Sequence, residues 1–279
     1  MILGRIPIGR SIEYFIEFLE THIGFATNTV SDWIEVLIDF FQTVCLAVPP
    51  VVFGGAIVLL ALKLAGRNVA IFTAVGLYLI YDMNLWIPTI TTIAMVVVAT
   101  LISICLGVPI GILSSRSDTV NRIVTPILDF MQTMPAFVYL IPVIPFFGLG
   151  TVPGVMATVI FAMPPTIRLT NLGIRQVPKE LIEASDSFGS TDRQKLVKVQ
   201  LPMAKPTIMA GINQTIMLAL SMVVIAAMIG AKGLGGVVWK AIQRLEVGMG
   251  FEGGLGVVIV AIILDRLTQQ LSKGSGTNL

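Results

Sequence analysis

The sequence predicts an all-α fold, a polytopic bundle of about seven transmembrane helices. Of its 279 residues, 55% are hydrophobic and only 12% are charged, whereas about a quarter of a soluble globular domain is charged. Mean hydropathy is +0.91, and uncharged stretches long enough to cross a bilayer recur along the chain. A chain of this length folded in water could not hide so much apolar area. These observations exclude a soluble enzyme, a disordered chain and a disulfide scaffold.

The few polar and reactive residues exclude other classes of protein. The net charge of +2 leaves no basic excess to attract nucleic acid, so we expect no nucleic-acid partner. The two cysteines, Cys45 and Cys105, sit in apolar runs and carry no expected redox role. The single histidine, His22, lacks the neighbours that a metal site needs, so we expect no metal.

Residues 1–42 are predicted to be an amphipathic N-terminal segment on the outer side of the membrane. A first amphipathic stretch covers residues 12–19, and in a second one Ile34, Ile38 and Phe41 recur at helical spacing. The polar face is acidic, so attraction to anionic lipid headgroups does not explain it. We expect the segment to pack against the outer ends of the bundle, with a position in the membrane interface as the alternative.

Seven uncharged or nearly uncharged stretches follow as candidate spans. The run over residues 130–167 must fold back, because at about 1.5 Å per residue it is far longer than the ~30 Å hydrocarbon core. The break is expected at Gly148–Gly154, which is rich in glycine. We expect two scaffold spans in residues 43–87, a core domain in residues 88–271 and a tail in residues 272–279. The predicted spans cover residues 43–62, 68–87, 88–115, 126–147, 152–169, 206–231 and 253–271.

The placement of lysine and arginine predicts the orientation in the membrane. The connection over residues 168–205 is strongly charged. When this loop is placed in the cytoplasm, most lysines and arginines of the chain fall on the cytoplasmic side. We therefore expect a multi-pass protein with its N-terminus outside and its C-terminus in the cytoplasm.

The cytoplasmic loop at residues 168–205 contains the signals of two short helices. Pro178 suits a first helical turn, where its missing N–H would be unpaired anyway. Gly189 is placed as the glycine that ends this helix, and Thr191 with Gln194 has capping-box spacing for the next one. Two short helices with a tight corner make a rigid knob, which can transmit force from a soluble partner.

The second short helix is expected to run to Leu201 and to stop at Pro202, because proline removes a backbone donor. We call the two helices, residues 178–202, the knob.

One motif in the knob resembles a family signature. Glu183, Ala184 and Ser185 are followed by Gly189, and the run Val199-Gln200-Leu201-Pro202 completes the pattern. It resembles the EAA motif of ABC-importer permeases, with serine in place of the second alanine and valine in place of isoleucine. In that family this loop forms the coupling helices, which dock in a groove of the ATPase subunit.

Longer stretches extend the resemblance over residues 88–271. Thr125–Tyr139, Ile160–Arg168 and Ala210–Met228 resemble the permeases of glycine betaine/proline betaine importers. The resemblance implies a type I ABC importer permease with a MetI-like core, in a bacterial inner or plasma membrane. It implies uptake of compatible solutes for osmoprotection, and it leaves open a permease for choline or carnitine.

The resemblance also implies partners. Two copies of the permease would enclose one pathway, and an extracytoplasmic binding protein would deliver the substrate. Separate ATPase chains would bind ATP and Mg and dock at the knob, so this chain is expected to be a transport subunit without enzymatic activity or a cofactor of its own. Leu181 and Phe188 are expected to be apolar anchors, with Glu183 beside them. The candidate coupling residues are Leu181, Glu183, Ala184, Ser185, Phe188, Gly189, Leu201 and Pro202.

Aromatic residues of the core spans are candidates for the substrate path. A quaternary ammonium group cannot donate classical hydrogen bonds, and aromatic faces attract it through cation–π interactions. Phe137, Tyr139 and Phe161 are the candidates. Packing or contact with lipid is the alternative for all three.

Two other classes of membrane protein compete with the importer. A stand-alone secondary transporter or channel would fit the broken helix at Gly148–Pro153, but the sequence shows neither internal repeats nor paired charges at midplane. An intramembrane enzyme would need a cluster of catalytic groups inside the spans, and the sequence shows none. Co-purification with an ATPase distinguishes an importer from a stand-alone transporter.

The predicted orientation can be tested with single cysteines in a variant without the two native ones. Ser115 and Ser190 are expected in the cytoplasm, and His22 and Lys232 outside. An impermeant thiol reagent should therefore label cysteine at positions 22 and 232 on intact cells and leave positions 115 and 190 unlabelled until the cells are opened. Labelling on intact cells at position 190 but not at position 232 would show that the orientation is the reverse of the predicted one.

Overall fold

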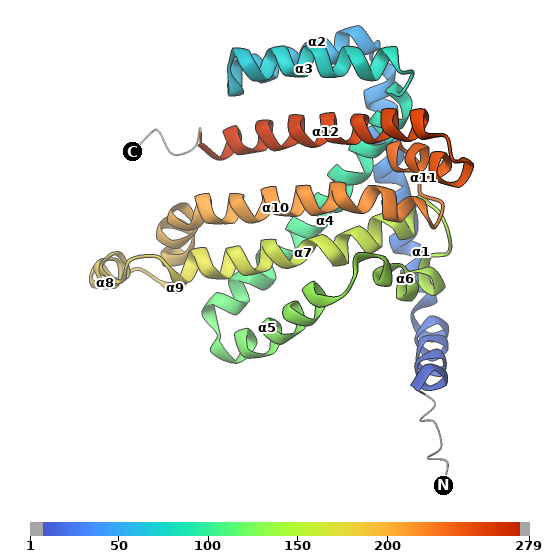
Figure 1. Cartoon of the computed structure of the whole chain (residues 1–279). Coiled ribbons are helices and arrows are strands. Elements are labelled where there is room, and N and C mark those ends of the chain that lie inside the picture. The colour runs from blue at the N-terminus through green and yellow to red at the C-terminus, as the bar shows by residue number, and fades with distance from the viewer. Residues whose placement is uncertain (1–7, 274–279) are drawn as a thin grey trace.

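The computed structural model describes residues 8–273, and every regular element in this range is a helix (Figure 1). Long apolar runs become helices because hydrocarbon offers the backbone no water, and a helix pairs its N–H and C=O groups within one segment. The all-α prediction is confirmed. The elements in chain order are α1 (Ile8–Ala47), α2 (Pro50–Ala65), α3 (Arg67–Asp82), α4 (Trp86–Arg116), α5 (Asp118–Thr133), the 3-10 helix η1 (Ala136–Tyr139), α6 (Leu140–Phe147), α7 (Thr151–Arg175), α8 (Lys179–Ser187), α9 (Asp192–Lys195), the π-helical turn η2 (Leu196–Gln200), α10 (Leu201–Ala227), α11 (Leu234–Arg244) and α12 (Val247–Lys273).

Four helical segments among the described residues are long and apolar enough to cross a membrane unaided. They are α4, α7, the continuous segment Asp192–Ala227 that includes α10, and α12. Two bent helix pairs meet the same criterion when each pair is taken as one span, which raises the number to six. Helix α3, with 16 residues, adds a further apolar helix beside α2 and α12 (Figure 1). The prediction of about seven spans is therefore roughly confirmed.

Two of the predicted spans are bent pairs rather than straight helices. The chain turns by 99° between the second half of α1 and α2, inside the span predicted at residues 43–62. It turns by 113° between α5 and the segment of η1 and α6, inside the span predicted at residues 126–147. Proline accounts for both bends: Pro49 and Pro50 stand at the first break, and Pro135 stands at the second. Proline cannot donate to the helical ladder, and it holds the preceding residue, such as Met134 (ψ 135°), in an extended conformation.

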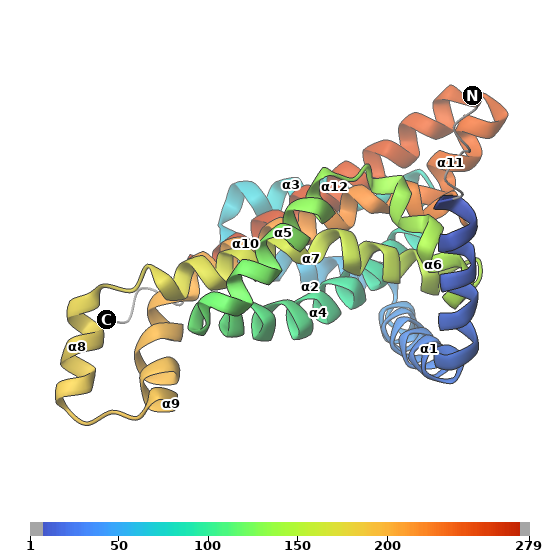
Figure 2. The same cartoon turned by 90° about the horizontal axis from the view of Figure 1, so that it is seen from below.

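Helix α1 lies across one end of the bundle, roughly perpendicular to α4, α7 and α10 (Figures 1 and 2). Ile34 and Ile38 are each only 3% exposed. They form one apolar cluster with residues of α4, α7 and α10, including Met95, Val155 and Ala226. This is the packing against bundle ends that the amphipathic pattern predicted. The two predicted stretches belong to one continuous helix, which runs beyond the expected boundary at residue 42 as far as Ala47; residues 1–7 of the segment and 274–279 of the predicted tail lie outside the described residues.

The centre of the bundle is the close packing of α7 against α4 and α10. A β-carbon added at Gly111 of α4 would lie 2.6 Å from Thr170 Cβ of α7. One added at Gly211 of α10 would lie 3.0 Å from Leu169 Cβ of α7. The helices approach so closely because small residues at the contact allow it, as is common for helices packed in membranes.

The contact at Gly111 predicts a strong sensitivity to a single added methyl group. Gly111→Ala should lower the thermal stability of the purified protein in detergent, by about 1–3 kcal/mol, because neither Thr170 nor the adjacent backbone can yield without shifting a helix. Gly55→Ala on α2 is the matched control, since its β-carbon would meet no atom within 4 Å. Equal melting temperatures for the two variants would contradict the proposed closeness of α4 and α7.

Candidate functional site

The knob projects from the end of the bundle opposite α1 (Figure 2). The predicted capping box is present: the Gln194 backbone N–H donates to the Thr191 hydroxyl at 3.3 Å, and the Thr191 backbone N–H donates to Gln194 Oε1 at 2.9 Å. Lys195 Nζ of α9 lies 2.6 Å from Asp186 Oδ1 of α8. The two helices of the knob are thus joined by a charged contact as well as by the turn.

Gly189 ends α8 in the left-handed conformation that the sequence predicted, with φ of 72°. Its N–H donates to the Asp186 carbonyl at 2.9 Å, and the Ser190 N–H donates to the Ser185 carbonyl at 3.1 Å. This pair of bonds is the Schellman motif. A β-carbon at Gly189 would meet no atom within 4 Å, so replacing the glycine costs backbone energy and causes no clash within the chain.

The second helix of the knob does not stop at Pro202, and that prediction was wrong. Helix α9, the π-helical turn and α10 form the continuous segment Asp192–Ala227. The Leu201 N–H donates to the Leu196 carbonyl, five residues earlier, instead of four. This π-helical turn precedes a proline whose missing N–H falls in the first turn of α10, where it is tolerated. Leu201 and Pro202 therefore belong to a stem that continues directly into a membrane span.

The candidate coupling residues on α8 form an exposed surface around one buried member. Phe188 is 90% exposed and Leu181 is 40% exposed, although both are large apolar residues. Glu183 and Ala184 are exposed as well. Ser185, at the position where the family motif has alanine, is buried, and its hydroxyl donates to a carbonyl of the preceding turn at 2.8 Å. The two large apolar candidates and the acidic one thus lie together on α8 and its C-terminal cap, exposed on the surface of the chain.

The three aromatic candidates for the substrate path lie in different surroundings. Tyr139 is buried, its hydroxyl donates to the Met131 carbonyl, and its ring meets that of Phe161 edge to face at 5.7 Å. Phe161 is half-buried and packs in the same cluster. Phe137 is 56% exposed. Within a single copy of the chain, Phe137 is therefore the candidate whose ring is most open to a ligand.

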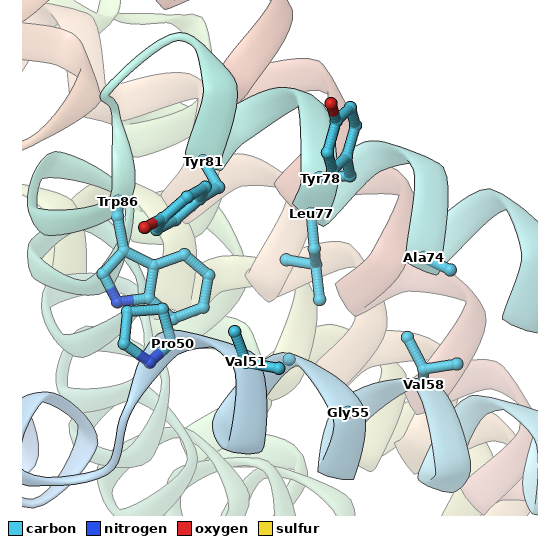
Figure 3. A pocket seen from close by; sticks show the side chains of 10 residues that line it. Pro50, Val51, Gly55, Val58, Ala74, Leu77, Tyr78, Tyr81 and Trp86 are labelled. Atoms are coloured by element: carbon cyan, nitrogen blue, oxygen red, sulfur yellow. The ribbon is translucent and has the colours of Figure 1, made fainter.

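An apolar pocket of about 240 Å³ lies between α2 and α3, away from these aromatic residues (Figure 3). Tyr78, Tyr81 and Trp86 line it together with aliphatic and small side chains. No charged side chain is among its lining residues, so the lining offers no cation to form an ion pair with a carboxylate. We interpret it as a groove between scaffold helices.

A polar hollow of about 400 Å³ lies at the end of the bundle opposite the knob. Glu35 and Asp39 of α1 line it, together with Lys232 from the turn after α10 and Phe147 from the end of α6. Charges of both signs and an aromatic ring therefore border one hollow. The sequence predicted only that the two acidic residues lie on the polar face of an amphipathic helix, and not that they line a hollow with Lys232.

The sequence also missed two ion pairs near the knob. Arg168 Nη2 lies 2.5 Å from Asp129 Oδ1, and Arg175 Nη2 lies 2.8 Å from Asp118 Oδ1. From the sequence, both arginines served only as signals of orientation. Their partners lie 39 and 57 residues away in the chain, so no local spacing could have revealed them.

Comparison with known proteins identifies the family. The family model described as the binding-protein-dependent transport system inner membrane component matches residues 107–274, which include the C-terminal end of α4, all helices from α5 to α12 and the knob. The chain belongs to this family. It is a permease subunit of an ABC importer and a multi-pass inner membrane protein, and this membership does not support a stand-alone secondary transporter or channel.

Several relatives match the permease over nearly its whole length. The glycine betaine transport system permease protein OpuAB of Bacillus subtilis is 51% identical over 96% of this chain and 95% of its own. The glycine betaine/carnitine transport permease protein GbuB of Listeria monocytogenes is 54% identical over 97% of both chains. ProW of Escherichia coli, the glycine betaine/proline betaine permease, is 48% identical over 97% of this chain and 76% of its own.

The permease also resembles a solved structure. A chain of the MetNI methionine ABC transporter in an inward-facing conformation superimposes with a TM-score of 0.60 at 22% identity, covering 66% of this chain and 92% of that one. At this identity the likeness concerns the fold alone. It supports the predicted MetI-like core.

Substitutions at Phe137, whose ring is exposed, can distinguish a role in substrate recognition from a role in packing. If it stacks on a quaternary ammonium group, Phe137→Leu should reduce uptake roughly thirtyfold, because a desolvated cation–π contact is worth about 2 kcal/mol. Phe137→Trp should be mild. Phe72→Leu on α3, another exposed aromatic position, is the control. Equal uptake by the leucine and tryptophan variants in proteoliposomes would reduce Phe137 to a packing role.

Proposed function

We propose that this permease is the membrane subunit of an ATP-driven importer for glycine betaine/proline betaine-type compatible solutes. The names of its relatives at 48–54% identity support this substrate class. Carnitine is the next candidate, because GbuB, the glycine betaine/carnitine permease, shares 54% identity with this chain. Uptake of radiolabelled glycine betaine by cells that carry this chain with its partner genes tests the proposal, with unlabelled carnitine and choline as competitors.

The observation that carries the proposal is the knob with its exposed aromatic tip. A phenylalanine that is 90% exposed on a rigid, charged helix has no role in packing this chain. It suits insertion into a pocket of a partner, as buried aromatic anchors do at protein interfaces. We propose that Phe188 and Leu181 insert into a groove of an ATPase subunit, and that Glu183 supplies a charged or capping contact beside them.

ATP and Mg are proposed to bind only on these ATPase chains. The permease would then convert their closure into alternating access through the knob and the continuous helix that follows it. Two copies of the permease are proposed to enclose one path, because a single copy presents exposed candidate residues such as Phe137 on its surface.

The proposed orientation places the knob in the cytoplasm. The C-terminal end of α12 lies toward the same end of the bundle, whereas α1, α6 and α11 lie at the opposite end (Figure 1). That opposite end would face the extracytoplasmic binding protein. The polar hollow with Glu35, Asp39 and Lys232 lies on this side, where a released zwitterion would first meet charges of both signs.

A substitution at Gly189 tests the coupling role of the knob. Gly189→Asp should leave the permease inserted and dimeric but weaken ATPase docking, and substrate-stimulated ATP hydrolysis should vanish together with uptake. A β-carbon in the left-handed conformation costs on the order of 1 kcal/mol and would redirect the end of α8. Pull-down measures assembly, and proteoliposomes with purified ATPase and binding protein measure hydrolysis.

Gly189→Asn is the matched control, because asparagine adds the same β-carbon at nearly the same size but places no negative charge at the C-terminal end of α8, where the helix dipole disfavours an anion. It should retain most of the activity. Wild-type hydrolysis and uptake in the Gly189→Asp variant would show that the knob is not the coupling element.

A further inference from the structure

Helix α5 is attached to the bundle by very little apolar packing. Leu128 is its only residue classed as buried. Ile123, Ile127 and Phe130, which recur at helical spacing, are 60%, 53% and 66% exposed. In Figure 1 the helix leans away from α4, α7 and α10, although it connects α4 to η1. Something other than burial must fix its position relative to α7.

Three polar contacts, which we call the α5–α7 ladder, supply that attachment. They are Arg175 Nη2 to Asp118 Oδ1 at 2.8 Å, Asn171 Nδ2 to Asn121 Oδ1 at 2.7 Å, and Arg168 Nη2 to Asp129 Oδ1 at 2.5 Å. On each helix the participating residues recur at intervals of about one or more whole turns, so they share one face. Their order is reversed between the two helices, as antiparallel neighbours require.

One end of the ladder is joined closely to the knob. Arg175 is the last residue of α7 and precedes α8 by only a short connection. Ile174 and Val177 on either side of it are 3% and 8% exposed, so the connection is packed and has little freedom to bend. Arg175 also donates to the Ser114 carbonyl of α4 at 2.9 Å and, through Nε, to Asn171 Oδ1 at 2.9 Å. A displacement of α8 must therefore act on the end of α7.

The other end of the ladder leads to the aromatic candidates for the substrate path. Beyond Asp129, α5 ends at Thr133 and the chain bends into η1, which carries Phe137 and Tyr139. The Tyr139 hydroxyl donates a hydrogen bond to the Met131 carbonyl of α5, and this bond joins η1 to that helix. The buried Tyr139 ring also packs in one cluster with residues of α7 and α10, so η1 is held both by α5 and by these two helices, and a displacement of α7 together with α5 would carry η1 with it.

The rung at Arg168 has the strongest reason to stay closed. The Arg168 Nε is buried and has no hydrogen-bond partner in the described part of the chain. Arg168 lies in the membrane-spanning helix α7, and its charge is balanced by Asp129 of α5. Both side chains are partly exposed, at 37% and 58%, but the rung lies at the end of a membrane span, where separating two opposite charges is less favourable than in open water. Movement of α7 should therefore take α5 along and leave the pair intact.

We propose that the α5–α7 ladder makes α5 and η1 follow the knob, and that Arg168 and Asp129 are positioning residues for substrate translocation. This inference rests on the proposed function, because it concerns the step between ATPase movement and the opening of the path. The knob receives the force, and the ladder passes it to the segment that carries Phe137. Without the ladder, the ATPase should still dock and hydrolyse ATP, but the substrate path should no longer open once for each cycle of hydrolysis.

The test measures transported glycine betaine per ATP hydrolysed in proteoliposomes that contain permease, ATPase and binding protein. For Arg168→Gln and Asp129→Asn we expect this ratio to fall about tenfold, within the range by which residues between two sites alter coupling, while stimulated hydrolysis stays within about twofold of wild type. Assembly in a pull-down should be unchanged. The exchanged pair, Arg168→Asp with Asp129→Arg, should recover most of the ratio. Arg122→Gln, an exposed arginine on α5, is the matched control and should behave as wild type.

Several results would overturn the inference. An unchanged ratio, a parallel loss of hydrolysis and uptake, or an exchanged pair that fails to recover would each reduce the ladder to a structural role. If Arg168→Gln does not assemble, Asp118→Asn at the most exposed rung is measured against the same criteria. A wild-type complex that takes up no glycine betaine would contradict the proposed function instead, because that outcome does not depend on any ladder variant.

Discussion

Helix α7 packs closely against both α4 and α10, and the positions of the other helices and of the knob follow from this contact. Gly111 and Gly211 allow the three backbones to approach to distances that a β-carbon would prevent. Thr166 and Thr215 add a buried hydrogen bond of 2.8 Å between α7 and α10. In a bilayer, where lipid competes equally for apolar side chains, such close packing and interhelical hydrogen bonding hold helices together. Helix α7 is thereby fixed along its length, and its C-terminal end aims the knob.

Helix α5 is held by a different kind of contact from that of the central three. Interdigitated small residues leave α4, α7 and α10 little room to slide, since cores of this density do not deform continuously. The ladder joins α5 to α7 through side chains that keep a few discrete bonds while the backbones remain further apart. One part of the permease is therefore suited to remain rigid, and another is suited to move as an attached unit. This division places Phe137 on the attached unit, whereas Phe161 lies on α7.

Prolines illustrate how far local sequence could predict the fold. Pro50 and Pro135 mark breaks in the chain, but no local pattern predicts the angle of a bend, and both prolines were expected within straight spans. Pro202 was expected to end a helix and instead sits in the first turn of α10, after a π-helical turn. In each case proline removes a backbone donor, and the outcome depends on whether neighbouring segments allow the helix to continue. The predicted cap at Gly189 and the capping box at Thr191 were confirmed, because both depend only on bonds within one turn.

The amino-acid sequence is sufficient to predict that this protein is helical, that it spans a membrane, and that its charged loop resembles a motif of importer permeases. These features follow from composition and from bonds between residues close together in the chain. Three further features are visible only in the folded chain: α1 crosses the end of the bundle, Tyr139 is buried while Phe137 is exposed, and Arg168 pairs with Asp129. Each of these depends on which helix faces which. That choice is made by small residues and by charges dozens of positions apart, whose meeting no local pattern encodes.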